Sequence, residues 1–233
     1  MPRIVPRLDC PAQETNTVPQ PFYQQLLQLT DAAFADLNNA IANKRVAQAP
    51  NSEALFLSRW VTQAIKQQRF GKATAPYLKA WQQRSRAQGV NAGLKQEFER
   101  IEHSYRSLMV NSNRLPEIHQ RQLDELLSQL NAQGWVLDIE SEFNTEVNHA
   151  TGGKPSLVIA AQQLKGAFED DLLAKPLSLF VRGDHLALTA LAHQHQMLLH
   201  KQSDYKSLVK YHGEYVLYPE NSGPIIAELL PNS

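Results

Sequence analysis

Apolar residues recur at spacings of three and four over the first half of the chain, with polar residues between them. This is the pattern of amphipathic α-helices, whose apolar stripe faces a core. The clearest run is Leu94, Phe98, Ile101, Tyr105 and Leu108. Together with the proline, glycine and capping positions, the pattern predicts five helices, which run from Phe22 to Ile41, Asn51 to Gly71, Thr74 to Gly89, Leu94 to Leu108 and Pro116 to Gly134.

After Gly134 the chain turns to short runs of β-branched, aromatic and aliphatic residues, which favour strands. The predicted elements are strands at 135–139, 157–160, 177–182 and 216–218, a weaker strand at 225–228, and a helix capped by Asp184. We therefore expect an α+β protein. It consists of a flexible proline-containing leader (1–20), a basic domain formed by a bundle of about five helices (21–134), and a smaller α/β domain with a mostly antiparallel sheet (135–233).

The charges are unevenly distributed, although 23 basic and 23 acidic residues cancel over the whole chain. Residues 41–114 hold 13 Lys and Arg against 4 Asp and Glu, whereas residues 115–150 hold 1 against 7. A local positive excess of this kind attracts polyanions. Non-enzymatic nucleic-acid binding, most of all DNA binding in a regulatory or accessory role, is therefore the leading hypothesis.

Basic residues bracket the turn between the second and third predicted helices. A helix, a glycine-containing turn and a second helix rich in Lys, Gln and Arg is the layout of a helix-turn-helix reader. In this hypothesis the phosphate contacts are Lys66, Arg69 and Lys72, the base contacts are Lys79, Gln82, Gln83 and Arg86, and Arg84 completes the candidate set. A solvated helix face with no ligand is the alternative explanation of the same pattern.

A protein–protein interaction module is the competing hypothesis, because a basic helix also fits an acidic protein surface. One such surface is the acidic stretch 115–150 of the same chain. The charge asymmetry would then be structural. The deciding observation is whether the basic residues are exposed or are neutralised by Asp124, Glu125, Glu140 and Glu142.

A second DNA-binding hypothesis rests on the segment 176–182, which precedes a predicted helix and is similar to the start of a ribbon-helix-helix module. In such proteins, paired strands from two subunits enter the major groove. The residues that would face the bases are Ser178, Phe180 and Arg182. This hypothesis requires a homodimer, and a strand inside a sheet is the competing interpretation.

The histidines suggest an enzyme as a further alternative. On one strand, Lys210, His212 and Glu214 would share a side and could do acid–base chemistry, although Gly213 disturbs the alternation. The histidines at 193 and 195 lie two apart on a predicted helix, so they point apart and cannot chelate one metal. The sequence thus predicts no catalytic residue, no metal and no cofactor, and the chain is not expected to be an enzyme.

Cysteine content and hydropathy indicate the cellular compartment of the protein. The single cysteine, Cys10, cannot form an intramolecular disulfide, which indicates a reducing compartment. The first residues include no apolar run of the kind that a signal peptide has, and no stretch of about 20 apolar residues follows. We therefore expect a cytoplasmic protein without a membrane span.

Three segments resemble an uncharacterised bacterial family, one of the domains of unknown function. They are residues 56–70, 88–94 and 205–215, and the resemblance spans about 45–220. The resemblance implies a helical block followed by a C-terminal hairpin and suggests an accessory gene. It implies no catalytic residue.

Overall fold

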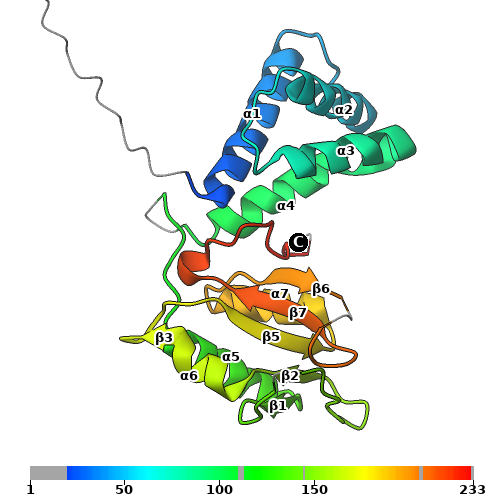
Figure 1. Cartoon of the computed structure of the whole chain (residues 1–233). Helices are drawn as coiled ribbons and strands as arrows, with labels where there is room; N and C mark the ends of the chain where they lie inside the picture. The colour runs from blue at the N-terminus through cyan, green and yellow to red at the C-terminus, as the bar shows by residue number, and fades with distance from the viewer. Residues whose placement is uncertain (1–19, 110–112, 144, 205–206, 232–233) are drawn as a thin grey trace, which may run out of the picture.

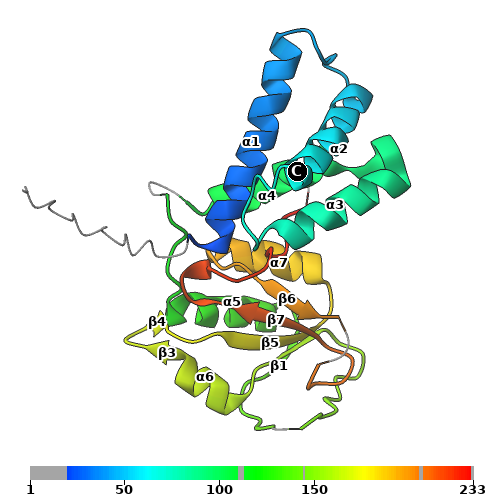
Figure 2. The ribbon, with the colours of Figure 1, turned by 45° about the horizontal axis from the view of Figure 1, so that its top comes forward.

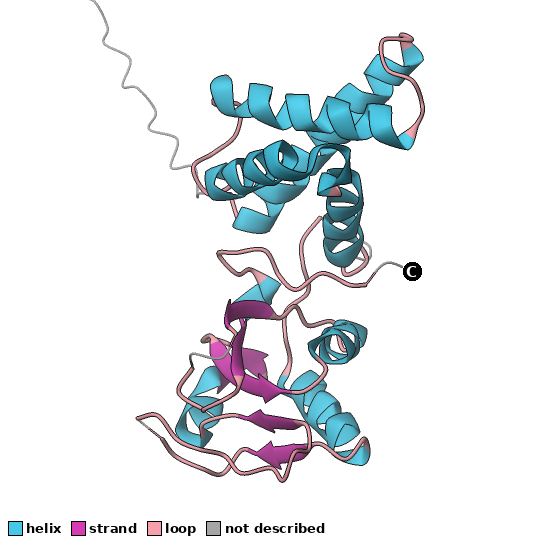
Figure 3. Ribbon diagram, turned by 90° about the vertical axis from the view of Figure 1, so that its right-hand side faces the viewer, coloured by secondary structure: helices cyan, strands magenta, loops and turns pink. Residues whose placement is uncertain are grey.

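The structure is a computed structural model that describes residues 20–109, 113–143, 145–204 and 207–231. Four N-terminal helices form the upper part in Figure 1, and a sheet with its helices forms the lower part. The C-terminal segment lies between these two parts, as Figures 1 and 3 both show. The predicted leader, including Cys10, lies outside the described residues apart from position 20. The predicted α+β fold class is confirmed.

The first four helices are α1 (Phe22–Ala42), α2 (Pro50–Lys66), α3 (Ala75–Gln88) and α4 (Leu94–Arg106), with a 3₁₀ turn, η1 (Gly89–Ala92), before α4. The ends of α3 follow the predicted signals, whereas α2 begins at Pro50, before the predicted cap at Asn51, and ends at Lys66, before the predicted stop at Gly71. Pro50 and Pro76 occupy first-turn positions of α2 and α3, where a missing N–H costs nothing. Gly89 ends α3 with a φ of 57°, which glycine adopts without strain.

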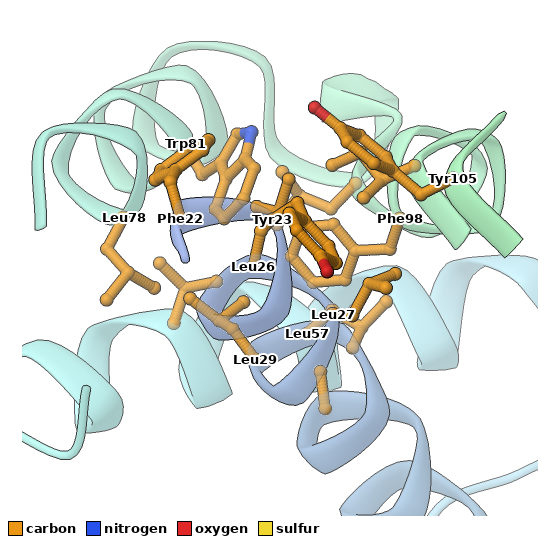
Figure 4. Packing of buried hydrophobic residues seen from close by; sticks show 14 of the residues in the cluster. Phe22, Tyr23, Leu26, Leu27, Leu29, Leu57, Leu78, Trp81, Phe98 and Tyr105 are labelled. Atoms are coloured by element: carbon orange, nitrogen blue, oxygen red, sulfur yellow. The ribbon is translucent and has the colours of Figure 1, made fainter. Parts of the chain in front are cut away.

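Large apolar side chains of these helices form one core, which Figure 4 shows from close by. Leu26, Phe98 and Tyr105 are fully buried there. The ring of Trp81 meets the edge of the Phe98 ring with 4.8 Å between centroids, which is the arrangement that aromatic quadrupoles prefer. The apolar stripes read from the sequence therefore face one another.

The fifth predicted helix, α5 (Gln120–Ala132), packs with the sheet and not with the first four helices. Its buried leucines share a second core with strand residues such as Leu157 and Leu179. The helix begins four residues later than expected from Pro116, because His119 and Gln122 form a reciprocal capping box. An amphipathic stripe shows that a face is buried, but not which partner buries it.

Five strands form a mixed sheet in the order β1-β2-β5-β7-β6. The strands are β1 (Val136–Asp138), β2 (Ser156–Val158), β5 (Leu177–Arg182), β6 (His200–Ser203) and β7 (Gly213–Leu217). Only the β1–β2 pair is parallel, and the other three pairs are antiparallel. The face with Leu177 and Leu179 packs in the second core, and the other face carries Phe180 against Phe143.

The remaining elements are α6 (Ala161–Ala167), the small hairpin β3 (Phe168–Glu169) and β4 (Leu172–Leu173), α7 (His185–Gln194), and a second 3₁₀ turn, η2 (Pro219–Asn221). As predicted, the Asp184 side chain caps α7 by accepting hydrogen bonds from the N–H groups of Leu186 and Ala187. Figure 2 shows α7 between the sheet and the N-terminal helices. The predicted weak strand at 225–228 is wrong, because these residues form no strand.

The segment 225–230 instead fastens the N-terminal helices to the sheet through its backbone. Its N–H groups donate to the hydroxyl oxygens of Tyr77, Tyr105 and Ser104 at 2.9–3.0 Å. The Arg100 guanidinium donates to two of its carbonyl oxygens, and the Glu228 N–H donates to the Leu199 carbonyl at 2.7 Å. Side chains thus satisfy backbone groups that a strand would have paired with other strands.

Candidate nucleic-acid interface

The candidate interface lies where α2 ends and α3 begins. The backbone leaves α2 through a left-handed residue, Gln68, whose φ is 50°. Thr74 is buried just before α3, and its hydroxyl donates to the Gly71 carbonyl at 3.1 Å. Eight residues separate the two helices, whereas a helix-turn-helix has a turn of about three or four. The layout therefore departs from that motif.

Arg69 is exposed, but contacts within the helical part hold its guanidinium in place. Its Nη1 lies 2.6 Å from Asp36 Oδ2, and the same oxygen accepts a hydrogen bond of 2.7 Å from Trp60 Nε1. The guanidinium also lies over the rings of Trp60 and Phe70, 5.5 and 5.6 Å from their centroids. Burial raises the pKa of Asp36, but these hydrogen bonds outweigh it and hold the pKa below its usual value. The charge of Arg69 is therefore paired within the protein.

Two further candidates on α3 also have partners within the protein. Arg84 forms an ion pair with Glu97, which accepts a 2.7 Å hydrogen bond from Trp81 Nε1 on its other oxygen. The Gln82 amide donates to the Thr62 hydroxyl at 3.2 Å. The prediction that Gln82 faces base edges is therefore at odds with its position, because its amide points to α2.

The remaining five candidates are exposed and form what we call the basic face: Lys66, Lys72, Lys79, Gln83 and Arg86. Lys79, Gln83 and Arg86 are four and three residues apart, so they share one side of α3. Among the described residues, no carboxylate lies within ion-pair distance of the four cations. The basic face thus keeps its full charge at the surface.

The acidic stretch does not neutralise the basic face. Glu125 lies 3.7 Å from Arg121 and 3.3 Å from the His195 ring. The described part of the chain contains no ion pair that joins Asp124, Glu140 or Glu142 to the basic face. The intramolecular explanation of the charge asymmetry is therefore wrong for these residues.

A hollow of about 540 Å³ opens within the basic face. Residues from the end of α2, the turn and the start of α3 line it, with Ile65, Phe70 and Leu78 among the apolar ones and Lys72 and Lys79 among the polar ones. The sequence pattern does not predict that these apolar residues line a hollow. Phe70 gives the one available signal, because it follows the end of a helix inside a basic, polar turn.

The other two site hypotheses do not survive the geometry. β5 pairs with β2 on one side and β7 on the other, so Ser178, Phe180 and Arg182 cannot form an intersubunit ribbon. The expected acid–base cluster does not converge either. Lys210 pairs with Glu146, the buried His212 lies 2.8 Å from the Ser156 hydroxyl, and Glu214 accepts from Ser178. The first correction follows from strand pairing, and the second from a turn at Lys210 and Tyr211 that leaves only Glu214 of the three residues in β7.

His193 and His195 point apart, as their spacing of two on a helix predicts. His193 contacts the Ser104 carbonyl while His195 faces Glu125, so the two rings point to different partners. No group of three or more His, Cys, Asp or Glu in the described residues is arranged to hold a metal. None of the helices in the described part of the chain has both the length and the apolar composition of a membrane span.

Comparison with known proteins identifies a family. No curated protein and no solved structure matches the chain. A family model described as protein of unknown function (DUF2913) matches residues 21–230, which include every helix and strand described above. The resemblance seen in the sequence over about 45–220 lies inside this range and is confirmed. The chain belongs to the DUF2913 family.

Proposed function

We propose that this chain is a non-enzymatic nucleic-acid-binding protein with a regulatory or accessory role, and that DNA is its main ligand. One observation carries the proposal: the four cations of the basic face are exposed and have no carboxylate partner among the described residues. Arg69 and Arg84, in contrast, are already neutralised by Asp36 and Glu97. Ion pairs within the protein therefore neutralise part of the local positive charge, and the remaining cations are exposed at the surface.

Phosphate binding by this face has a quantitative signature. Each cation that neutralises a phosphate releases a counterion, and the logarithm of the affinity then falls with the logarithm of the salt concentration at about 0.9 per contact on duplex DNA. Four contacts give a slope of roughly −3 to −4. Lys79, Gln83 and Arg86 share one side of α3 and could each read a base edge, Gln83 through its amide and the two cations through guanine O6 and N7.

The test is fluorescence anisotropy of the full chain with a labelled mixed-sequence duplex at several salt concentrations. The test variant is Lys79→Glu/Arg86→Glu, which reverses two cations of the basic face. The matched control is Lys154→Glu/Lys165→Glu, which makes the same change in net charge at two exposed lysines in the lower part. Circular dichroism checks that both variants keep their helix content.

We expect salt-dependent binding by the wild type and the control, and no binding by the test variant. Equal loss of affinity in both variants would show a general charge effect and refute the assignment to this face. Absence of binding at low salt, to the duplex and to its separated strands alike, would refute the proposal itself and leave a basic docking face for an acidic protein as the better explanation.

A further inference from the structure

We propose that the hollow in the basic face receives the base of an unpaired nucleotide, so that the protein prefers single-stranded to duplex DNA. This inference rests on the proposed function and specifies its substrate. The hollow, of about 540 Å³, combines an apolar lining with two ammonium groups. A nucleotide has the complementary build, since a flat apolar ring is joined through a sugar to an anionic phosphate.

Phe70 supplies an aromatic surface in this hollow. Its ring is partly buried and tilted against Trp60, with 5.7 Å between centroids, and the Arg69 guanidinium lies over it. Asp36 in turn holds Arg69 in place. The ring is thus fixed in position before any ligand arrives, and a fixed ring is what base stacking requires.

The cations lie where the backbone of a single strand would pass. Lys72 and Lys79 line the hollow itself, and Arg86 follows Lys79 by seven residues on the same side of α3. Seven residues span about 10 Å along a helix axis. When a base of the strand enters the hollow, Lys72 and Lys79 therefore lie near that nucleotide, and Arg86 lies near a nucleotide farther along α3.

The polar lining also favours a nucleotide over an acyl chain. Gln68 is one of the residues that line the hollow with the lysines, and its side-chain amide can both donate and accept hydrogen bonds, as base edges do. An acyl chain would leave that amide without a partner, which is unfavourable for a polar group that becomes covered. We therefore take an anionic amphiphile as the alternative that the experiment must distinguish.

The experiment compares three labelled ligands with equal numbers of nucleotides per strand: a mixed-sequence single strand, its duplex, and a single strand whose bases are replaced by abasic sites. The proteins are the wild type, Phe70→Leu, which keeps an apolar side chain without an aromatic face, and Ala75→Phe, which fills the hollow from the first residue of α3. Thermal melting confirms that both variants fold. Anisotropy gives the affinities.

We expect the wild type to bind the single strand at least about fivefold more tightly than the abasic strand, since stacking one base contributes about 5- to 150-fold. It should also bind the single strand more tightly than the duplex. Both variants should lose the preference for the strand with bases, yet bind the duplex within about twofold of the wild type.

Equal affinity for the strands with and without bases would overturn the inference while leaving the proposed function in place, provided that the duplex binds. A second result would also overturn the inference. In it, dodecyl phosphate displaces the base-containing strand at a concentration that leaves duplex binding unchanged, and Phe70→Leu binds that strand as tightly as the wild type does. The hollow would then be assigned to an amphiphile. Failure of the wild type to bind any of the three ligands would instead refute the proposed function.

Discussion

His200 should make the folded protein sensitive to mild acid. The ring is 1% exposed, its Nδ1 lies 2.9 Å from the Ile225 carbonyl oxygen, and its edge meets the Tyr218 ring. Burial lowers the pKa of His200 to about 4, against 6.5 for an unperturbed histidine, and the hydrogen bond to Ile225 offsets only part of this effect. The neutral ring donates to the segment that joins the sheet to the helices.

The direction of the effect follows from proton binding. Below pH 6.5 the unfolded chain takes up a proton at this histidine, whereas the folded chain does not until about pH 4. The free energy of unfolding therefore falls as the pH drops from 6.5 to 4, by about 1.36 kcal/mol per unit of pKa difference. The free energy of unfolding thus falls by about 3 kcal/mol in total, and about 2 kcal/mol of this fall occurs between pH 7.5 and pH 5.

Urea unfolding followed by circular dichroism at pH 7.5 and pH 5 measures this loss. The comparison protein is His200→Gln, because an amide can still donate to the Ile225 carbonyl but does not titrate. Burial also lowers the pKa values of His193 and His212, but both histidines are present in both proteins and their contributions cancel in the difference. The wild type should lose about 2 kcal/mol more than the variant. Equal losses would refute the assignment of this pH dependence to His200.

Three further substitutions test the packing by urea unfolding at pH 7.5. Tyr105→Phe removes the buried hydroxyl that accepts from the Ala227 N–H and should cost about 1–3 kcal/mol; a cost near zero would contradict this role. Gly223→Ala places a Cβ 2.5 Å from the His200 ring and should cost about 1–3 kcal/mol, whereas an unchanged midpoint would show that the ring can move. Asp184→Ala removes the cap of α7 and should cost about 1 kcal/mol, with Asp184→Asn near wild type as its control.

Local signals predicted the helices well, because the residues that end a helix lie next to it in the chain. Gly89 marks the end of α3, and Asp184 caps α7 at the predicted position. The strand at β5 was predicted with its observed bounds, since its apolar run is flanked by Pro176 and Gly183. Strand order was not predicted, and for this reason the intersubunit ribbon was wrong; the acid–base cluster was wrong because β7 begins only at Gly213, after a turn at Lys210 and Tyr211.

The contacts that join the two parts have no signal in the sequence. Asn221 is fully buried, and its side chain bonds the backbone at Pro116, Gln196 and Leu198. These partners lie up to 105 residues away. A polar residue between a turn and a proline is usually read as a loop, and only the folded chain shows that Asn221 joins η2 to the segments before α5 and after α7.

The basic residues of the helical part fall into two groups, paired and unpaired, which the sequence does not distinguish. Cations that the fold requires lie beside carboxylates or carbonyls brought close by packing, as Arg69 lies beside Asp36, 33 residues earlier in the chain. Cations of the basic face, such as Lys79 and Arg86, have no such partner among the described residues, and like charges gathered at a surface repel one another. Folding gains nothing from keeping them together. For this reason the proposed function rests on the unpaired cations around the hollow and not on the total charge, which counts cations such as Arg69 that are already paired.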